Sequence, residues 1–223
     1  MLLFLTTSIP HDGKNWALRI LQGYCGMNPD PLVRRRLIWQ GPRRRNLPGV
    51  NPKLLGNQTP PKMALWKTLH EQLVRQSYVV TLLYDVQRDQ FSHPVTAGSE
   101  TRSAGDGPFA REMIEETYRF VLGNVVFCLT RYLRIPDHLQ EKEQDGSPRI
   151  NSKLPAFETL VPFDPEDKWI LTASVEVLNG NDPEQVQRGV DELISVKSEF
   201  EGCYDFQLMD RHIFDTRVMI KTQ

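Results

Sequence analysis

The stretch KWILTASVEVLNGNDPEQVQRGVDELISVKSEFE, residues 168–201, decides the fold class of this chain. Its first part alternates apolar and polar residues with a period of two, which predicts a half-buried strand. The apolar positions of this strand are Leu171, Ala173, Val175 and Val177. Asn179 and Gly180 then favour a turn, because both residues tolerate positive φ.

A helix with its own start and stop signals follows this turn. Asp182 is a suitable N-cap, Pro183 suits the first helical position, and Gln185 completes a capping box. Gly202 is placed to end the helix. One apolar stripe should face the strand or a shared sheet, and it consists of Val186, Val190, Leu193, Ile194 and Phe200. The stretch is therefore a strand–turn–helix unit, and nothing in it indicates catalysis.

The first 40 residues predict a similar plan. Residues 2–7 read as a strand, residues 12–26 as a helix, and residues 34–40 as a second strand. The C-terminal unit has a possible closing strand at 204–208, so the two ends of the chain share the order strand, helix, strand. This similarity suggests a pseudo-symmetric body, although no repeat is visible at the level of the letters.

The middle of the chain adds strands and a hairpin. Residues 77–87, SYVVTLLYDVQ, have strong β propensity, and residues 117–122 and 125–133 flank the hairpin turn Gly123-Asn124. The total is about seven mostly antiparallel strands with two helices. We therefore predict an α+β fold with a curved sheet or a flattened β-barrel and two packed helices.

The chain is expected to form a single domain over residues 1–223, with loop insertions at about 41–65, 88–108 and 137–153. These three segments are rich in Pro, Gly, Asn and charged residues and hold few apolar ones. We expect the last two to be flexible and to contribute little to stability.

Composition narrows the class of protein. A hydrophobic fraction of 39% and a charged fraction of 25% are ordinary for a soluble protein. No segment approaches the ~20 apolar residues of a membrane span, and the opening MLLFL reads as a strand rather than a signal peptide. Cys25, Cys128 and Cys203 lie far apart, without ligand spacing, which indicates a reducing compartment.

Charge is distributed unevenly along the chain. Residues 1–75 hold 12 Lys or Arg against 3 Asp or Glu, whereas residues 151–223 hold 7 against 14. The split predicts either two surfaces of opposite sign or attraction between the two ends within the fold.

No motif in the sequence carries recognisable chemistry. His70-Glu71 resembles the start of a zinc-protease motif, but position 74 is Val, so the second ligand is missing. The carboxylate pairs Glu141/Glu143 and Glu199/Glu201 fall in a predicted loop and a predicted helix, where they read as solvated charge. We assign no catalytic, cofactor-binding or metal-binding residue.

The sharpest remaining features are two arginine runs, residues 34–36 and 43–45, which flank the predicted strand LIWQGP. Guanidinium groups bind phosphates through paired hydrogen bonds, so the runs could contact nucleic acid. Trp39 is the sole aromatic residue between them, which is sparse for a base-stacking surface. They could equally bind a protein partner or pair within the chain, and the sequence leaves all three interpretations open.

The order of several segments resembles the Mediator complex subunit 18 family. LFLTTSIP, WALRILQGYCGM and RRRLIWQGP resemble its opening, and TYRFVLGNVVFCLTRYLRIP and WILTASVEVLNGNDPEQVQRGVDELISVKSEF resemble its hairpin and terminal strand–helix. The resemblance covers about two thirds of the chain, excluding the loops. It implies a flattened β-barrel that is related in shape to the tunnel triphosphatases but lacks their catalytic site.

The resemblance also implies a role without enzymatic chemistry or a cofactor. A member of this family would be a nuclear structural subunit in the head module of Mediator, the coactivator that bridges gene-specific regulators and RNA polymerase II. It would form a heterodimer with the related barrel of Mediator subunit 20 and bind the C-terminal helix of Mediator subunit 8. No motif places its partner-binding residues. The alternative is a nucleic-acid-binding module that uses the arginine runs at 34–36 and 43–45.

Overall fold

The computed structural model describes residues 1–40, 77–86, 109–144, 146, 148–151, 153–207 and 217–218. The loop insertions expected at 41–65 and 88–108, and the second arginine run within the first of them, lie outside these residues.

Seven strands form one hydrogen-bonded path in the order β1-β7-β5-β4-β2-β3-β8, and every pairing is antiparallel. The short strand β6 (Val161–Pro162) pairs with β5 off this path. The bounds of the seven are β1 Leu2–Ile9, β2 Asp30–Gln40, β3 Ser77–Asp85, β4 Phe109–Leu122, β5 Val125–Arg134, β7 Trp169–Glu176 and β8 Arg217–Val218.

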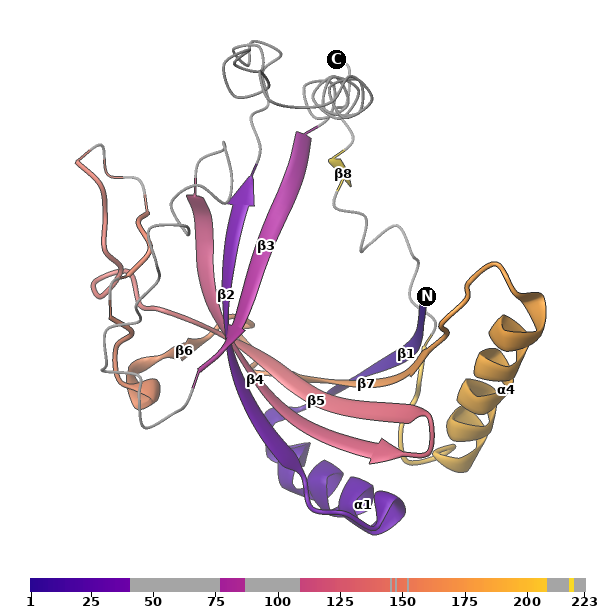
Figure 1. Cartoon of the computed structure of the whole chain (residues 1–223). Helices are drawn as coiled ribbons and strands as arrows, with labels where there is room; N and C mark the ends of the chain where they lie inside the picture. Colours follow the sequence, from indigo (N-terminus) through magenta and orange to yellow (C-terminus); the bar gives the residue numbers. More distant parts are fainter. Residues whose placement is uncertain are drawn as a thin grey trace, which may run out of the picture.

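Two α-helices are described, α1 (Lys14–Cys25) and α4 (Pro183–Glu199), together with the 3-10 turns η1 (His11–Gly13) and η4 (Phe157–Thr159). Figure 1 shows α1 and α4 at the end of the sheet where β1, β7, β5 and β4 run together, while β2 and β3 continue away from them. Neither helix is long and apolar enough to cross a membrane.

This arrangement confirms the predicted α+β class with a curved antiparallel sheet and two packed helices. Of the two forms considered for the sheet, the described strands show the open one, because the path has two ends, β1 and β8. The closing strand expected at 204–208 is reduced to a single bridge between Gln207 and Thr6.

The main core lies between the two helices and one face of the sheet, which we call the helix-side face. Leu21 of α1, Phe120 of β4, Phe127 of β5 and Leu171 of β7 are all fully buried there. Aromatic rings from α1, β5 and the end of α4 meet edge to face in the same cluster, with Tyr24 and Phe200 at 4.7 Å between ring centroids. A second, smaller core contains Val33, Ile114, Leu133, Ile135, Leu154 and Leu160.

The strand–turn–helix unit at the C-terminal end is confirmed. The Asp182 side chain accepts hydrogen bonds from the backbone N–H groups of Glu184 and Gln185, and the expected apolar strand positions are buried. The predicted helix stripe needs one correction. Ile194 is 60% exposed, and the face against the sheet is instead formed by Gly189, Leu193, Val196 and Phe200.

Gly189 explains how closely α4 approaches the sheet. A Cβ atom at this position would lie 3.0 Å from Leu3 Cδ1 and 3.1 Å from Val177 Cγ2, which is tighter than ordinary van der Waals contact. The absence of a side chain therefore lets the helix backbone rest directly on β1 and on the end of β7.

The loop over residues 137–153 is the second correction. It has little regular structure, as expected, but it is not independent of the body, because Asn151 is 3% exposed and contacts both β2 and β4. Its anchor is polar rather than apolar, and a low content of apolar residues therefore does not predict that the loop is free.

Candidate functional site

The arginine run Arg34–Arg36 lies in β2, where successive side chains point to opposite faces of the sheet. Arg34 Nε donates to Asp85 Oδ1 at 3.2 Å, and Arg36 Nη2 donates to Glu115 Oε2 at 2.6 Å. Arg35, on the helix-side face, is fully buried and pairs with Glu112. The structure thus matches the intramolecular interpretation for this run.

Sequence reasoning missed the acidic residues of β4, two of which pair with these arginines, while Glu116 pairs with Arg131 of β5. Glu112, Glu115 and Glu116 all lie on β4 and are 4%, 7% and 2% exposed. The predicted strand began at residue 117, whereas β4 begins at Phe109, so these acidic residues fell outside the predicted strand. The one available signal was the arginine run itself, because three cations on a strand require acidic partners on an adjoining strand if they are buried.

Glu112 is held in a buried polar cluster at the junction of β2, β4 and the 137–153 loop. Arg35 Nε donates to Glu112 Oε1, Arg35 Nη2 donates to the Asn151 carbonyl at 2.6 Å, and the Asn151 N–H donates to Glu112 Oε2 at 3.2 Å. Burial raises the pKa of Glu112, and the charge and hydrogen bond of Arg35 act in the opposite direction. The cluster fixes the loop against the sheet.

A second buried carboxylate, Glu116, belongs to a chain of polar contacts that starts on the helix-side face. Arg131 Nε donates to Glu116 Oε2 at 2.7 Å, and Arg131 Nη1 lies 3.1 Å from Asp167 Oδ2. His11 Nδ1 lies 2.5 Å from the same Asp167 oxygen. The guanidinium carbon of Arg131 also stands 4.8 Å from the centre of the Trp169 ring.

The two carboxylate pairs singled out in the sequence do not form a site. Glu199 accepts hydrogen bonds from Tyr24 Oη at 2.5 Å and Ser195 Oγ at 3.1 Å, and Glu143 lies 3.6 Å from Arg149 at the surface. Burial, followed by the hydrogen bond to Glu199, raises the pKa of Tyr24 to about 12. Among the described residues, no group of three or more His, Cys, Asp or Glu side chains could hold a metal ion.

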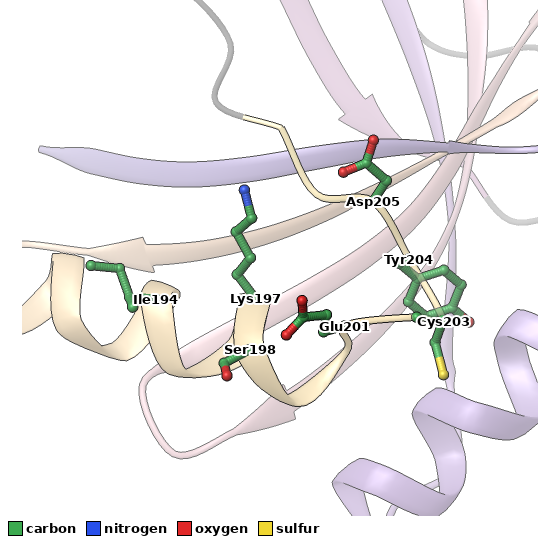
Figure 2. Close-up of a pocket in the computed structure, with 8 residues that line it drawn as sticks. Ile194, Lys197, Ser198, Glu201, Cys203, Tyr204 and Asp205 are labelled. Carbon is green, nitrogen blue, oxygen red and sulfur yellow. The ribbon is translucent and has the colours of Figure 1, made fainter.

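The surface best suited to binding lies beside the strap, residues 203–207, which follows α4 and reaches the edge of β1 at Gln207. Two adjoining cavities of about 510 and 620 Å³ share Cys203, Tyr204 and Asp205. Figure 2 shows the first cavity, with Ile194 and Lys197 projecting from α4 and Asp205 on the strap. The other residues of this cavity are Ser198, Glu201 and Gly202.

The second cavity lies along β1. Its walls include Thr7, Ser8 and Ile9 of that strand, Trp16 of α1 and Ile170 of β7. Trp16 is 52% exposed although its ring packs edge to face on Tyr204, at 5.7 Å between centroids. Exposed apolar groups beside hydroxyl and backbone groups suit contact with another protein.

The chain resembles one protein family over almost its full length. A family model described as "Med18 protein" matches residues 1–106 and 108–217.

Curated relatives match a shorter part. The protein named "Mediator of RNA polymerase II transcription subunit 18" of Yarrowia lipolytica is 31% identical over 110 residues, which cover 49% of this chain and 40% of that protein. The protein of the same name in Aspergillus oryzae is 27% identical over 109 residues, covering 49% and 38%. The chain thus spans about two fifths of the length of these relatives.

A solved structure shares the fold. The chain matches a chain of the "Structure of the Schizosaccharomyces pombe Mediator head module" with a TM-score of 0.53 and 13% identity, covering 92% of this chain and 96% of that chain. At this level of identity the likeness describes the arrangement of strands and helices alone.

Proposed function

This chain belongs to the Med18 family, and from that premise we propose that it is a non-enzymatic structural subunit of the Mediator coactivator. In this role it contributes to the regulation of RNA polymerase II transcription in the nucleus. The observation that carries the proposal is the family match, which extends over both ends of the sheet and both helices.

The proposed partners are the related barrel of Mediator subunit 20, in a heterodimer, and the C-terminal helix of Mediator subunit 8, within an assembly that contacts RNA polymerase II. The exposed apolar side chains Trp16 and Ile194, on either side of the strap, support a protein partner. The single domain proposed over residues 1–223 would present this surface next to β1.

Co-expression with subunits 20 and 8 tests the partners. A partner that binds only the folded chain adds RT ln(1 + [L]/Kd), about 2.7 kcal/mol at a hundredfold excess over Kd, so soluble yield and Tm should rise together. A mainly apolar contact should also survive moderate salt. Equal stability with and without both subunits would contradict the proposed heterodimer.

The pairing of the β4 glutamates supports a role without catalysis. Glu112, Glu115 and Glu116 each bind an arginine, so their charge is already used within the fold. Purified protein incubated with a nucleoside triphosphate and Mg²⁺ or Mn²⁺ should release no phosphate above a buffer blank. Turnover that is abolished by Glu141→Gln with Glu143→Gln, in a variant of unchanged Tm, would overturn this part of the proposal.

The nucleic-acid alternative is weakened by the ion pairs of Arg34, Arg35 and Arg36. Its remaining basis is the run at 43–45. A gel-shift titration with RNA at increasing salt separates the two functions, because phosphate contacts weaken steeply with salt. Binding at physiological salt that is lost when all three residues of that run are changed to Ala would favour the alternative.

A further inference from the structure

The outer edge of β1 carries backbone groups that point away from the sheet. Met1 and Val177 exchange two backbone hydrogen bonds, which sets the pattern of the β1–β7 ladder. Because bonded and non-bonded pairs alternate in an antiparallel ladder, Thr6 and Ser8 direct their N–H and C=O groups outward. Thr6 uses both of these groups to pair with Gln207 of the strap, at 3.1 and 2.8 Å.

The strap meets the edge only at its last residue, Gln207, and its earlier residues do not continue the pairing toward Ser8. Antiparallel continuation of the Thr6–Gln207 pair would place Asp205 opposite Ser8, yet no backbone hydrogen bond joins these two residues. Within the described part of the chain, the outward N–H and C=O of Ser8 have no backbone partner. The 620 Å³ cavity lies at this point, and Ser8 and Asp205 both line it.

The cavity has chemistry that matches an extended peptide. On one side is Trp16, 52% exposed, and on the other is Ile170, 39% exposed and directly opposite Ser8 in the β1–β7 register. Side chains of an added strand alternate between the two faces of a sheet, so they would meet these apolar groups in turn. The exposed carboxylate of Asp205, which accepts a hydrogen bond from Gln207 Nε2 at 3.3 Å, favours a basic side chain on the peptide.

We propose that β1 accepts at Ser8 an extended antiparallel segment of another subunit of the same assembly, with an apolar side chain packed on Ile170 or Trp16 and a Lys or Arg beside Asp205. This proposal rests on the function proposed above. The strap shows that this edge can accept an antiparallel segment, because Gln207 already pairs with Thr6, the neighbouring residue whose backbone groups point outward. A helical occupant would leave the backbone groups of Ser8 unused, whereas an extended one binds them.

Site-specific photo-cross-linking tests the proposal in the full-length chain. A benzoylphenylalanine at Ile170 is introduced into a tagged chain, the assembly is purified from cells, and irradiation is followed by mass spectrometry. We expect a cross-link to one other subunit of the co-purified assembly, in a peptide that contains Lys or Arg. The same probe at Leu178, which is 92% exposed on the turn before α4, should not give this product.

Ser8→Pro is the decisive variant. It removes the outward N–H, while the β1–β7 ladder stays intact because Ser8 and Ile170 are a non-bonded pair. We expect the cross-link yield to fall about two- to tenfold, the range for the loss of one backbone hydrogen bond. Ser8→Ala, which keeps the N–H, should leave the yield unchanged, and Tm should be the same for both variants.

The outcomes separate this inference from the proposed function. If the assembly co-purifies but Ile170 gives no cross-link to another subunit, or gives one that Ser8→Pro leaves unchanged, the edge-docking proposal is wrong and the function stands. A product between two copies of this chain also overturns the proposal. If no Mediator subunit co-purifies, the proposed function fails and, because the occupant is defined as a subunit of that assembly, the docking proposal fails with it.

Discussion

Arg35 on β2 and Glu112 on β4 form an ion pair in which neither side chain is exposed to solvent. The pair lies on the helix-side face, near the smaller core, and it holds the backbone of Asn151 from the 137–153 loop. Removing two charges from water costs several kcal/mol per ion, and the cost is offset only while both partners and their hydrogen bonds remain. The cost of burying these two charges is therefore offset only while both Arg35 and Glu112 are present.

Breaking the pair should cost more than removing it. Glu112→Leu leaves the Arg35 guanidinium buried without its carboxylate and should lower the unfolding free energy by about 3–5 kcal/mol. The double variant Arg35→Met with Glu112→Leu replaces both charges by apolar groups and should lose less than Glu112→Leu alone. Urea denaturation measures the parent protein, the single variants Glu112→Leu and Arg35→Met, and the double variant. A double variant that loses the sum of the two single losses would contradict this interpretation.

The 137–153 loop should contribute to stability through Asn151. Its side chain accepts hydrogen bonds from Gln140 Nε2 and the Glu141 N–H and donates one to the Leu139 carbonyl, each at 2.8 Å. Asn151→Ala removes these three hydrogen bonds of a buried side chain and should cost about 1–3 kcal/mol. Arg149→Ala is the matched control in the same loop, because its ion pair with Glu143 is exposed and should be worth at most about 1 kcal/mol. Equal thermal shifts for the two variants would show that the loop is not anchored.

Gly189 should be intolerant of even a methyl group. Gly189→Ala brings a Cβ within 3.1 Å of atoms on Leu3 and Val177, so α4 or the sheet must shift, at a cost of about 1–3 kcal/mol. Gly23→Ala, on the exposed side of α1 with no atom within 4 Å of its Cβ, should instead stabilise the protein by about 0.5–1 kcal/mol. Thermal unfolding of both variants should therefore shift in opposite directions.

Leu193 tests the corrected face of α4. It is 5% exposed against the sheet, so Leu193→Ala should cost about 2–5 kcal/mol through lost burial and a cavity. Glu192 would be a poor control, because its Oε1 accepts a hydrogen bond from Asn124 on the β4–β5 turn. Arg188 is exposed on the outer side of the helix, and Arg188→Ala should change stability by less than about 0.5 kcal/mol. Similar losses in both variants would mean that α4 packs by a different face.

The parts of this fold that the sequence predicted are those with local signals. The strand at 169–176, the Asp182 cap and the Gly123-Asn124 turn each depend on residues within a few positions of one another. The local propensity and periodicity of these segments agree with their packing in the fold, so short stretches of sequence were enough to predict them.

The parts that the sequence did not predict depend on partners distant along the chain. In the sequence, the acidic residues of β4 resemble a polar segment that precedes a strand, because their arginine partners on β2 and β5 are distant along the chain. Arg35, for example, is 77 residues away from Glu112. Ile194 fits the helical stripe of α4, but it lines the cavity beside the strap and remains exposed. Among the described residues, the backbone groups of Ser8 are left unpaired because the strap pairs with β1 at Thr6 alone, and no periodicity in the sequence predicts that position.

Tyr204 should make the protein sensitive to alkaline pH. Burial raises the pKa of Tyr204 from 10.0 to about 12, so the folded chain keeps a proton that the unfolded chain releases. Stability is then complete below pH 10 and falls as the pH rises from 10 to 12. Because the Tyr204 hydroxyl has no hydrogen-bond partner among the described residues, Tyr204→Phe should be nearly neutral at pH 7 and should lose less stability at pH 11. Urea denaturation at pH 7, 9 and 11 measures how the unfolding free energy of the parent protein and of the variant falls with pH. Tyr24 is present in both proteins, and its own pKa of about 12 accounts for the alkaline loss that remains in the variant. A variant that loses stability as steeply as the parent protein would show that the Tyr204 hydroxyl is solvated in the folded state.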